Sequence, residues 1–157
     1  TRLAQRIAKM PYGFVHRDYQ SRNLMVINDQ IVWIDFQDAL QGPRVYDLVA
    51  LLNDSYQEFD REFVEARLAE FAKAQKLSAK ATAELVREFD LVTVQRKLKD
   101  AGRFVFIDRK KGNPSFLRFV SPTIRKVKEA VARLSGADED MAALGQVLTR
   151  TLGAEFS

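Results

Sequence analysis

Apolar residues recur at helical spacing over most of the chain, and two short β-favouring runs interrupt this pattern near the N-terminus. The runs 24–27 and 31–34 are apolar and rich in β-branched residues, and the polar residues 28–30 between them form a turn of hairpin length. Helical spacing precedes Pro11 and resumes after Pro43, which is expected at the first position of a helix. The pattern therefore predicts one β-hairpin inside a mostly helical chain.

Four further helices are predicted between residue 59 and the C-terminus. Apolar residues at helical spacing mark them at 59–71, 85–98, 124–134 and 141–152. The polar segment 109–114 is the expected turn before the third of these helices. Trp33 on the hairpin and the phenylalanines of the first of these helices are expected in the core.

Composition and charge narrow the range of functions. The 157 residues, 46% hydrophobic and 29% charged, are enough for one core. A chain with no cysteine and one histidine cannot form a disulfide, a thiolate zinc site or a multi-histidine site, so any metal would be a hard, oxygen-liganded ion. A net charge of +4 permits an anionic ligand but does not indicate nucleic acid, which is not expected as a partner.

No run approaches the roughly 18 apolar residues of a membrane span, and the first residues lack an apolar signal core. We therefore expect no membrane partner and a cytoplasmic location. The chain begins at Thr1, already inside an expected helix, which favours a piece of a longer parent.

The candidate chemistry lies in the segment that contains the hairpin. His16, Asp18 and Asn23 form the pattern His-x-Asp-x4-Asn, and Asp35-Phe36 follow after the two strands. Protein kinases use this pattern for their catalytic and magnesium loops. Phosphoryl transfer needs a carboxylate that orients and deprotonates the attacking hydroxyl, which fits Asp18, and oxygen ligands for Mg²⁺, which fit Asn23 and Asp35.

Longer motifs extend this similarity. Residues 16–23, 34–38 and especially 42–54 resemble the aminoglycoside-phosphotransferase and choline-kinase superfamily. Within it, residues 15–26, 35–39 and 42–43 most resemble the anomeric sugar kinases that phosphorylate N-acetylmuramate or N-acetylglucosamine at C1. Residues 94–104 and 112–117 resemble the C-terminal helices and loop of the same group, so the resemblance covers nearly the whole chain.

The resemblance implies an α+β, mainly helical fold: the C-terminal lobe of a protein-kinase-like domain over residues 1–157. The catalytic and metal loops would lie at 14–40 and a helical substrate-binding subdomain at 43–157. The N-terminal nucleotide-binding lobe, with its phosphate-covering loop, lysine and glutamate, has no counterpart, since no Gly-x-Gly occurs. We therefore expect the chain alone to be inactive as a kinase, and its uncovered hairpin edge to favour self-association.

The supporting residues of the loop have weaker signals. His16 is expected to be a buried residue that holds the loop, whereas Arg17 could contact the loop backbone or be solvated. The resemblance gives Asp47 hydrogen bonds to the catalytic-loop backbone, although an acid near a helix start is also stabilised by the helix dipole. Candidates for substrate binding, each of which could instead be a solvated loop residue, are Gln20, Arg22 and Asp38.

The leading hypothesis is an ATP-dependent phosphotransferase acting on the anomeric hydroxyl of a cell-wall amino sugar, with Mg²⁺ as cofactor and the missing lobe as partner. Gln37, where protein kinases have glycine after Asp-Phe, favours a small-molecule kinase. One alternative is a kinase for an aminoglycoside or choline, although a cationic acceptor favours an acidic pocket and the net charge is a weak argument against it. The other is a non-catalytic pseudokinase or regulatory domain, against which the retention of Asp18, Asn23 and Asp35 argues.

Overall fold

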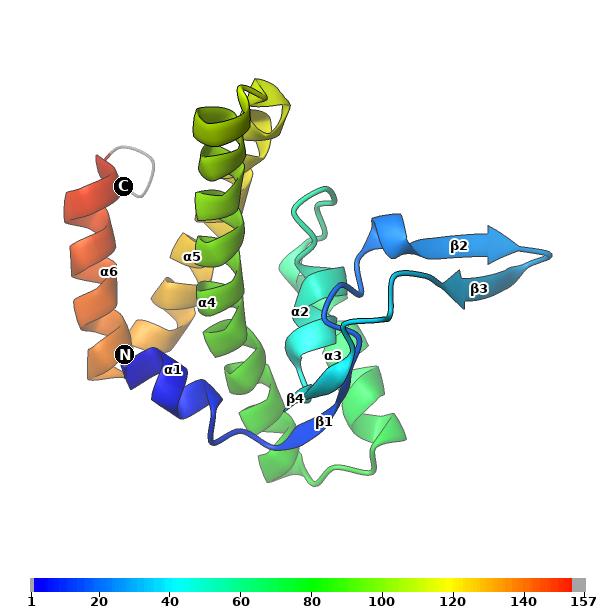
Figure 1. The fold of residues 1–157 in the computed structure, drawn as a ribbon. Helices are drawn as coiled ribbons and strands as arrows, with labels where there is room; N and C mark the ends of the chain where they lie inside the picture. Colours follow the sequence, from blue (N-terminus) through cyan, green and yellow to red (C-terminus); the bar gives the residue numbers. More distant parts are fainter. Residues whose placement is uncertain (1, 154–157) are drawn as a thin grey trace. The chain divides into compact units, whose positions relative to one another are not determined.

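The computed structural model describes residues 2–153, most of which are helical (Figure 1). The elements in chain order are α1 (Arg2–Ile7), β1 (Tyr12–Val15), the 3₁₀ helix η1 (Ser21–Asn23), β2 (Leu24–Ile27), β3 (Gln30–Trp33), β4 (Leu40–Pro43), α2 (Tyr46–Leu52), α3 (Arg61–Ala74), α4 (Ala79–Lys111), the 3₁₀ helix η2 (Pro114–Phe119), α5 (Val120–Ser135) and α6 (Glu139–Leu152). The strands form two separate two-stranded antiparallel sheets. A mainly helical chain with little sheet is what the apolar pattern predicts.

The predicted hairpin is confirmed as β2 and β3, which pair in register from Leu24 opposite Trp33 to Ile27 opposite Gln30. Its turn has two residues, Asn28 and Asp29, with φ values of 50° and 60°. Asn and Asp tolerate this left-handed backbone, which a two-residue hairpin turn of type I′ requires at both positions.

A second sheet, which the apolar pattern did not predict, joins β1 to β4. Gly13 lies opposite Gly42, and a Cβ added at Gly42 would lie 2.6 Å from a methyl group of Val15, so only glycine fits there. The prediction for Pro43 was wrong, because Pro43 ends β4 opposite Tyr12 and α2 begins only at Tyr46. This pairing closes the chain between residues 15 and 40 into one loop that carries the whole kinase-like motif.

The chain divides into two compact units, of which Arg6–Phe89 contains the motif. The buried apolar side chains of this unit are Met10, Val15, Val45, Val49, Ala50, Leu52, Val64, Leu68, Ala72, Leu85 and Phe89. The expectation that the phenylalanines of the predicted helix 59–71 lie in the core was wrong for Phe59 and Phe63. Phe59 precedes α3 and Phe63 lies in it, and their rings stack with centroids 5.0 Å apart and stay about 40% exposed. Trp33 is also exposed, because both faces of the hairpin lie open to solvent.

The second unit comprises residues 1–5 and 90–157. The amphipathic helices α5 and α6 pack together and bury apolar residues that include Val127, Val131 and Met141. Helix α4 runs on to Lys111, so the expected polar turn is shorter than predicted and begins at Gly112, whose φ is +61°. Within residues 2–153, no helix is long and apolar enough to cross a membrane.

Candidate active site

The motif begins with a sharp turn directly after β1. Arg17 has a φ of 74°, in the left-handed region that non-glycine residues rarely adopt. Asp47, in the first turn of α2, accepts hydrogen bonds from the backbone N–H of His16 at 2.6 Å and of Arg17 at 3.0 Å. One carboxylate therefore pairs two consecutive backbone donors and holds the turn that presents Asp18. These are the contacts that the resemblance implied for Asp47.

The His16 side chain supports the loop by packing. It is 2% exposed, its ring meets Tyr19 edge to face at 5.8 Å, and Tyr19 meets Trp33 in the same way at 5.7 Å. Among the described residues, neither ring nitrogen of His16 has a hydrogen-bond partner. A buried ring in this position suits a loop support better than a general base.

Two hydrogen bonds to one carbonyl explain the spacing between Asp18 and Asn23. The Asp18 carbonyl oxygen accepts from the backbone N–H of Gln20 and from Nδ2 of Asn23, both at 2.9 Å. The loop therefore folds back on itself, and the NH₂ group of Asn23 is fixed against the backbone of Asp18, the residue that the motif predicts as the base. This leaves the amide oxygen of Asn23 as the atom that could face a cation.

The hairpin returns Asp35 to Asn23. The backbone N–H of Ile34 donates to the Asn23 carbonyl at 3.1 Å, and Nδ2 of Asn23 lies 3.4 Å from Oδ2 of Asp35. Asp35 has a φ of 66°, and its other oxygen accepts from Nε2 of Gln37 at 2.6 Å. The Asn23 amide thus lies beside the Asp35 carboxylate, twelve positions further along the chain, and turns its NH₂ group toward Oδ2. The hard oxygens of an amide and a carboxylate are ligands that suit Mg²⁺.

The donor set also limits what the protein alone could hold. Within residues 2–153, no three His, Cys, Asp or Glu side chains gather where they could bind a metal ion. In kinases, Mg²⁺ keeps several water ligands and takes others from the substrate phosphates. Two protein oxygens are therefore enough for Mg²⁺, whereas an ion that takes all its ligands from the protein would need more.

The remaining predicted residues lie around the same loop. Nη1 of Arg17 contacts the backbone carbonyl of Asp38 at 3.4 Å, while the Asp38 side chain is exposed. Gln20 precedes η1 without a side-chain capping bond. The Arg22 guanidinium lies 3.5 Å above the Tyr56 ring, a cation–π contact. The structure thus fixes Arg22 on an aromatic support and leaves Asp38 in solvent.

Sequence reasoning missed the contact between Ser21 and Asp54. Asp54 follows α2, is 1% exposed, and accepts from the backbone N–H of Ser21 at 3.0 Å and from its hydroxyl at 2.6 Å. The two residues are 33 positions apart, so no local spacing could reveal the contact. The only signal was that Asp54 ends the stretch 42–54 that resembles the kinases.

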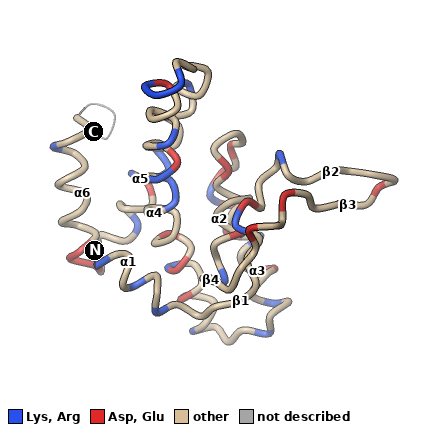
Figure 2. The backbone as a smooth tube through the Cα atoms, in the orientation of Figure 1, with Lys and Arg blue, Asp and Glu red and all other residues tan. Residues whose placement is uncertain are grey.

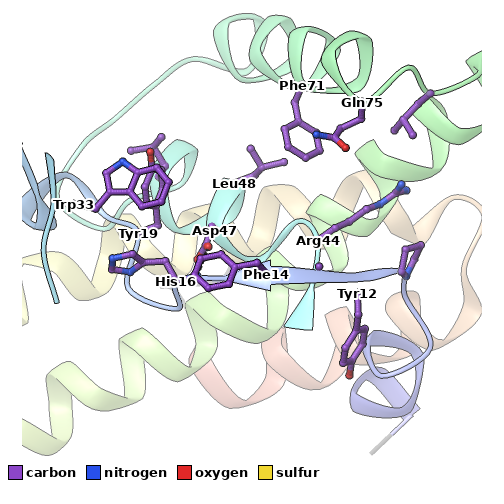
Figure 3. Close-up of a pocket in the computed structure, with 14 residues that line it drawn as sticks. Tyr12, Phe14, His16, Tyr19, Trp33, Arg44, Asp47, Leu48, Phe71 and Gln75 are labelled. Atoms are coloured by element: carbon purple, nitrogen blue, oxygen red, sulfur yellow. Dashed lines mark hydrogen bonds between the residues drawn. The ribbon is translucent and has the colours of Figure 1, made fainter. Parts of the chain in front are cut away.

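A cavity of about 760 Å³ lies beside the catalytic loop, within the same unit (Figure 3). Its wall is mainly aromatic and aliphatic, with side chains from β1, α2 and α3, and it includes His16 and Tyr19 but not Asp18. Arg44, on the same wall, donates to the buried carboxylate of Glu88 at 2.9 Å. The cavity therefore adjoins the loop on the side of His16.

Comparison with known proteins decides the family. Residues 1–85 match the phosphotransferase enzyme family. The chain belongs to this family. The phosphotransferase-family chain is also 35% identical over 150 residues to an N-acetylmuramate/N-acetylglucosamine kinase of Pseudomonas aeruginosa. The matched region covers 93% of the chain and 43% of that kinase.

Two other relatives carry the same name. Identity is 37% over 149 residues with the kinase of Neisseria meningitidis serogroup B, covering 92% of the chain and 43% of the relative. Identity is 34% over 142 residues with the kinase of Pseudomonas putida, and the match covers 88% of the chain and 41% of the relative. The phosphotransferase-family chain spans less than half the length of these relatives. The resemblance seen in its motifs is confirmed.

Proposed function

We propose that this chain is the C-terminal, catalytic lobe of an ATP-dependent kinase that phosphorylates the anomeric hydroxyl of an amino sugar such as N-acetylmuramate or N-acetylglucosamine. The observation that carries the proposal is the placement of Asn23, whose NH₂ group holds the Asp18 carbonyl at 2.9 Å while its side chain lies beside Asp35. These contacts connect the proposed base, Asp18, with the two proposed metal ligands, Asn23 and Asp35. The names of the three relatives support the choice of acceptor.

In the proposed reaction, the Asp18 carboxylate accepts a hydrogen bond from the acceptor hydroxyl and takes its proton as the oxygen attacks the γ-phosphorus. The new O–P bond forms while the bond to the β-phosphate oxygen breaks, so that ADP leaves. Mg²⁺ bound by Asn23 and Asp35 would neutralise charge on the β- and γ-phosphates. His16 and Asp47 keep the turn before Asp18 in place, the first by packing and the second by hydrogen bonds.

The other parts of the enzyme follow from the same proposal. An N-terminal lobe holds the adenine and phosphates of ATP, since the relatives are more than twice as long as the matched region. The helices after Gly42 contribute the acceptor pocket, and Gln20, Arg22 and Asp38 are the loop residues that we place nearest the substrates. A kinase using cellular ATP is expected in the cytoplasm.

The direct test is an acceptor panel with the full-length enzyme. Sugar phosphate and ADP are measured with Mg²⁺ and ATP or GTP on N-acetylmuramate, N-acetylglucosamine, other hexoses, choline and kanamycin. Turnover confined to the amino sugars supports the proposal, whereas turnover confined to choline or kanamycin identifies an amine kinase instead. If no acceptor reacts and a titration shows no Mg²⁺–nucleotide binding, the domain is a pseudokinase.

A further inference from the structure

The segment between the proposed base and the proposed metal ligand is anchored from outside the motif. Ser21 lies between Asp18 and Asn23, and both its backbone N–H and its hydroxyl donate to Oδ2 of Asp54, at 3.0 Å and 2.6 Å. The other oxygen of Asp54 accepts from the backbone N–H of Tyr56 at 3.0 Å. The carboxylate therefore connects the loop to the chain that follows α2.

Burial makes this connection energetically significant. Asp54 is 1% exposed, and a buried carboxylate is costly unless hydrogen bonds satisfy it. Its two oxygens accept three hydrogen bonds from Ser21 and Tyr56. Hydrogen bonds to a charged carboxylate are stronger than those between neutral groups. Moving Ser21 away would leave the carboxylate under-satisfied in the interior, so the loop is held in one position.

A second contact holds the next residue of the loop in the same direction. The Arg22 guanidinium lies 3.5 Å above the ring of Tyr56. The backbone N–H of this same tyrosine donates to Asp54. Ser21 and Arg22 are thus both attached to residues 54–56. Asn23 follows directly, and its backbone N–H donates to the Gln20 carbonyl at 2.9 Å within η1.

From these contacts we infer that Asp54 is a positioning residue for phosphoryl transfer, which sets the separation of Asp18 and Asn23 through Ser21. This inference rests on the proposed function. Asp54 does not touch the reacting atoms, so its removal should lower kcat by misplacing the base relative to the metal and leave substrate binding largely intact. Misplacement by about 1 Å can cost on the order of 100-fold in rate.

The test compares Asp54→Asn with Asp60→Asn in the full-length enzyme. Asp60 is a matched control because it also accepts a hydrogen bond from a backbone N–H, that of Phe63 at 2.7 Å. This bond caps α3 and does not involve the loop of Asp18 and Asn23. The expected result for Asp54→Asn is a kcat lowered about 10- to 100-fold, with KM for ATP and sugar changed less than about threefold. Asp60→Asn should keep the wild-type kcat.

Ser21→Ala covers the case in which Asp54→Asn does not fold, because it removes only the 2.6 Å hydroxyl bond. It should lower kcat by several-fold, and the double variant should be no slower than Asp54→Asn alone, since both act through one contact. A kcat within twofold of wild type for Ser21→Ala, additive losses in the double variant, or a rise in KM at unchanged kcat would overturn the inference.

A readout without turnover separates this inference from the proposed function. Hydrogen exchange of the Ser21 amide, followed by NMR in the 157-residue chain, should be at least tenfold faster in Asp54→Asn than in wild type and unchanged in Asp60→Asn. Unchanged exchange at Ser21 in Asp54→Asn overturns the anchor itself. Faster exchange together with an inactive wild-type enzyme leaves the anchor in place and rejects the kinase proposal on which its catalytic role depends.

Discussion

Asp47 accepts a hydrogen bond of 2.6 Å from the backbone N–H of His16, a residue 31 positions earlier in the sequence. The same carboxylate accepts from Arg17, whose φ of 74° the loop must maintain. Asp47→Ala leaves both backbone donors without this acceptor at a partly buried site. We expect it to lower the free energy of unfolding by about 1–3 kcal/mol, measured by urea denaturation of the 157-residue chain.

The control for this prediction is Asp138→Asn. Asp138 caps α6 by accepting from the Met141 N–H at 3.2 Å, and asparagine caps helices about as well as aspartate. This variant should stay within about 0.5 kcal/mol of wild type. Equal stability of Asp47→Ala and wild type would mean that the turn does not depend on Asp47.

Asp35→Asn tests the metal site. If Asp35 is the anionic ligand that we propose, its removal should raise the Mg²⁺ concentration for half-maximal turnover of the full-length enzyme by about 10- to 100-fold or more. Losses of that scale follow when even a residue that supports a metal ligand is removed. Asp29→Asn makes the same charge change at the hairpin tip, where φ is 60° and asparagine is tolerated. An unchanged Mg²⁺ requirement in Asp35→Asn would remove Asp35 from the metal site.

The hairpin predicts self-association of the 157-residue chain. Asp29 is the one charged residue between positions 24 and 34, and Figure 2 shows both strands without charge. Val26 and Ile31, directly opposite each other, are 74% and 62% exposed. Exposed apolar strands of this kind pair with other chains unless something covers them.

The double variant Val26→Lys with Ile31→Glu places a cross-strand ion pair on this surface. Light scattering should give a molar mass above that of the monomer for wild type and the monomer mass for the variant. Val147→Lys changes an exposed valine on α6 and should leave association as it was. A monomeric wild-type chain would argue against the prediction.

The buried Lys97 predicts a pH dependence of stability. Burial lowers the pKa of its ammonium from 10.5 to about 8, opposed by Asp100 at 3.1 Å and reinforced by Arg96 and Lys126. Between these two values the unfolded chain binds more protons than the folded chain, so this group makes stability rise with pH. The lowered pKa means that burying the charged Lys97 ammonium reduces the free energy of unfolding by about 3 kcal/mol at most. This reduction is fully present well below pH 8, where the ammonium is charged in both states.

Urea unfolding near pH 7.5 and near pH 10 tests this sign. The free energy of unfolding of wild type, minus that of Lys97→Met, should increase between the two conditions. Lys99→Met is the control, because Lys99 contacts the same Asp100 at 3.7 Å but is exposed. A constant difference between wild type and Lys97→Met would show that Lys97 does not titrate in this range.

The elements with a regular period were predictable from the sequence, whereas those that depend on distant partners were not. The hairpin follows from two β-favouring apolar runs around a short polar turn, and α5 follows from helical spacing. The pairing of β1 with β4 was missed because each strand is four residues long and contains glycine, so neither has a local strand signal. Pro43 fits a helix start by local rules, but its place is set by the strand opposite.

The same division holds at the site. Fixed spacing and residue type led to the proposal of Asp18 as base and of Asn23 and Asp35 as metal ligands, because the chemistry of phosphoryl transfer restricts both. Ser21 and Asp54 have no such constraint, since a hydroxyl between two functional residues and an acid at a helix end are common. Their contact appears only when the fold brings together residues 33 positions apart.

The role of Asp18 as the base is tested most directly by the rate of sugar phosphorylation by the full-length enzyme carrying Asp18→Asn. The rate is measured as sugar phosphate formed from N-acetylmuramate and N-acetylglucosamine. We expect a kcat lower by about 10²- to 10⁴-fold, the usual contribution of a positioned base, with Mg²⁺–ATP binding retained. Asp29→Asn should turn over at the wild-type rate. A wild-type kcat in Asp18→Asn would show that Asp18 is not the group that takes the proton from the sugar hydroxyl.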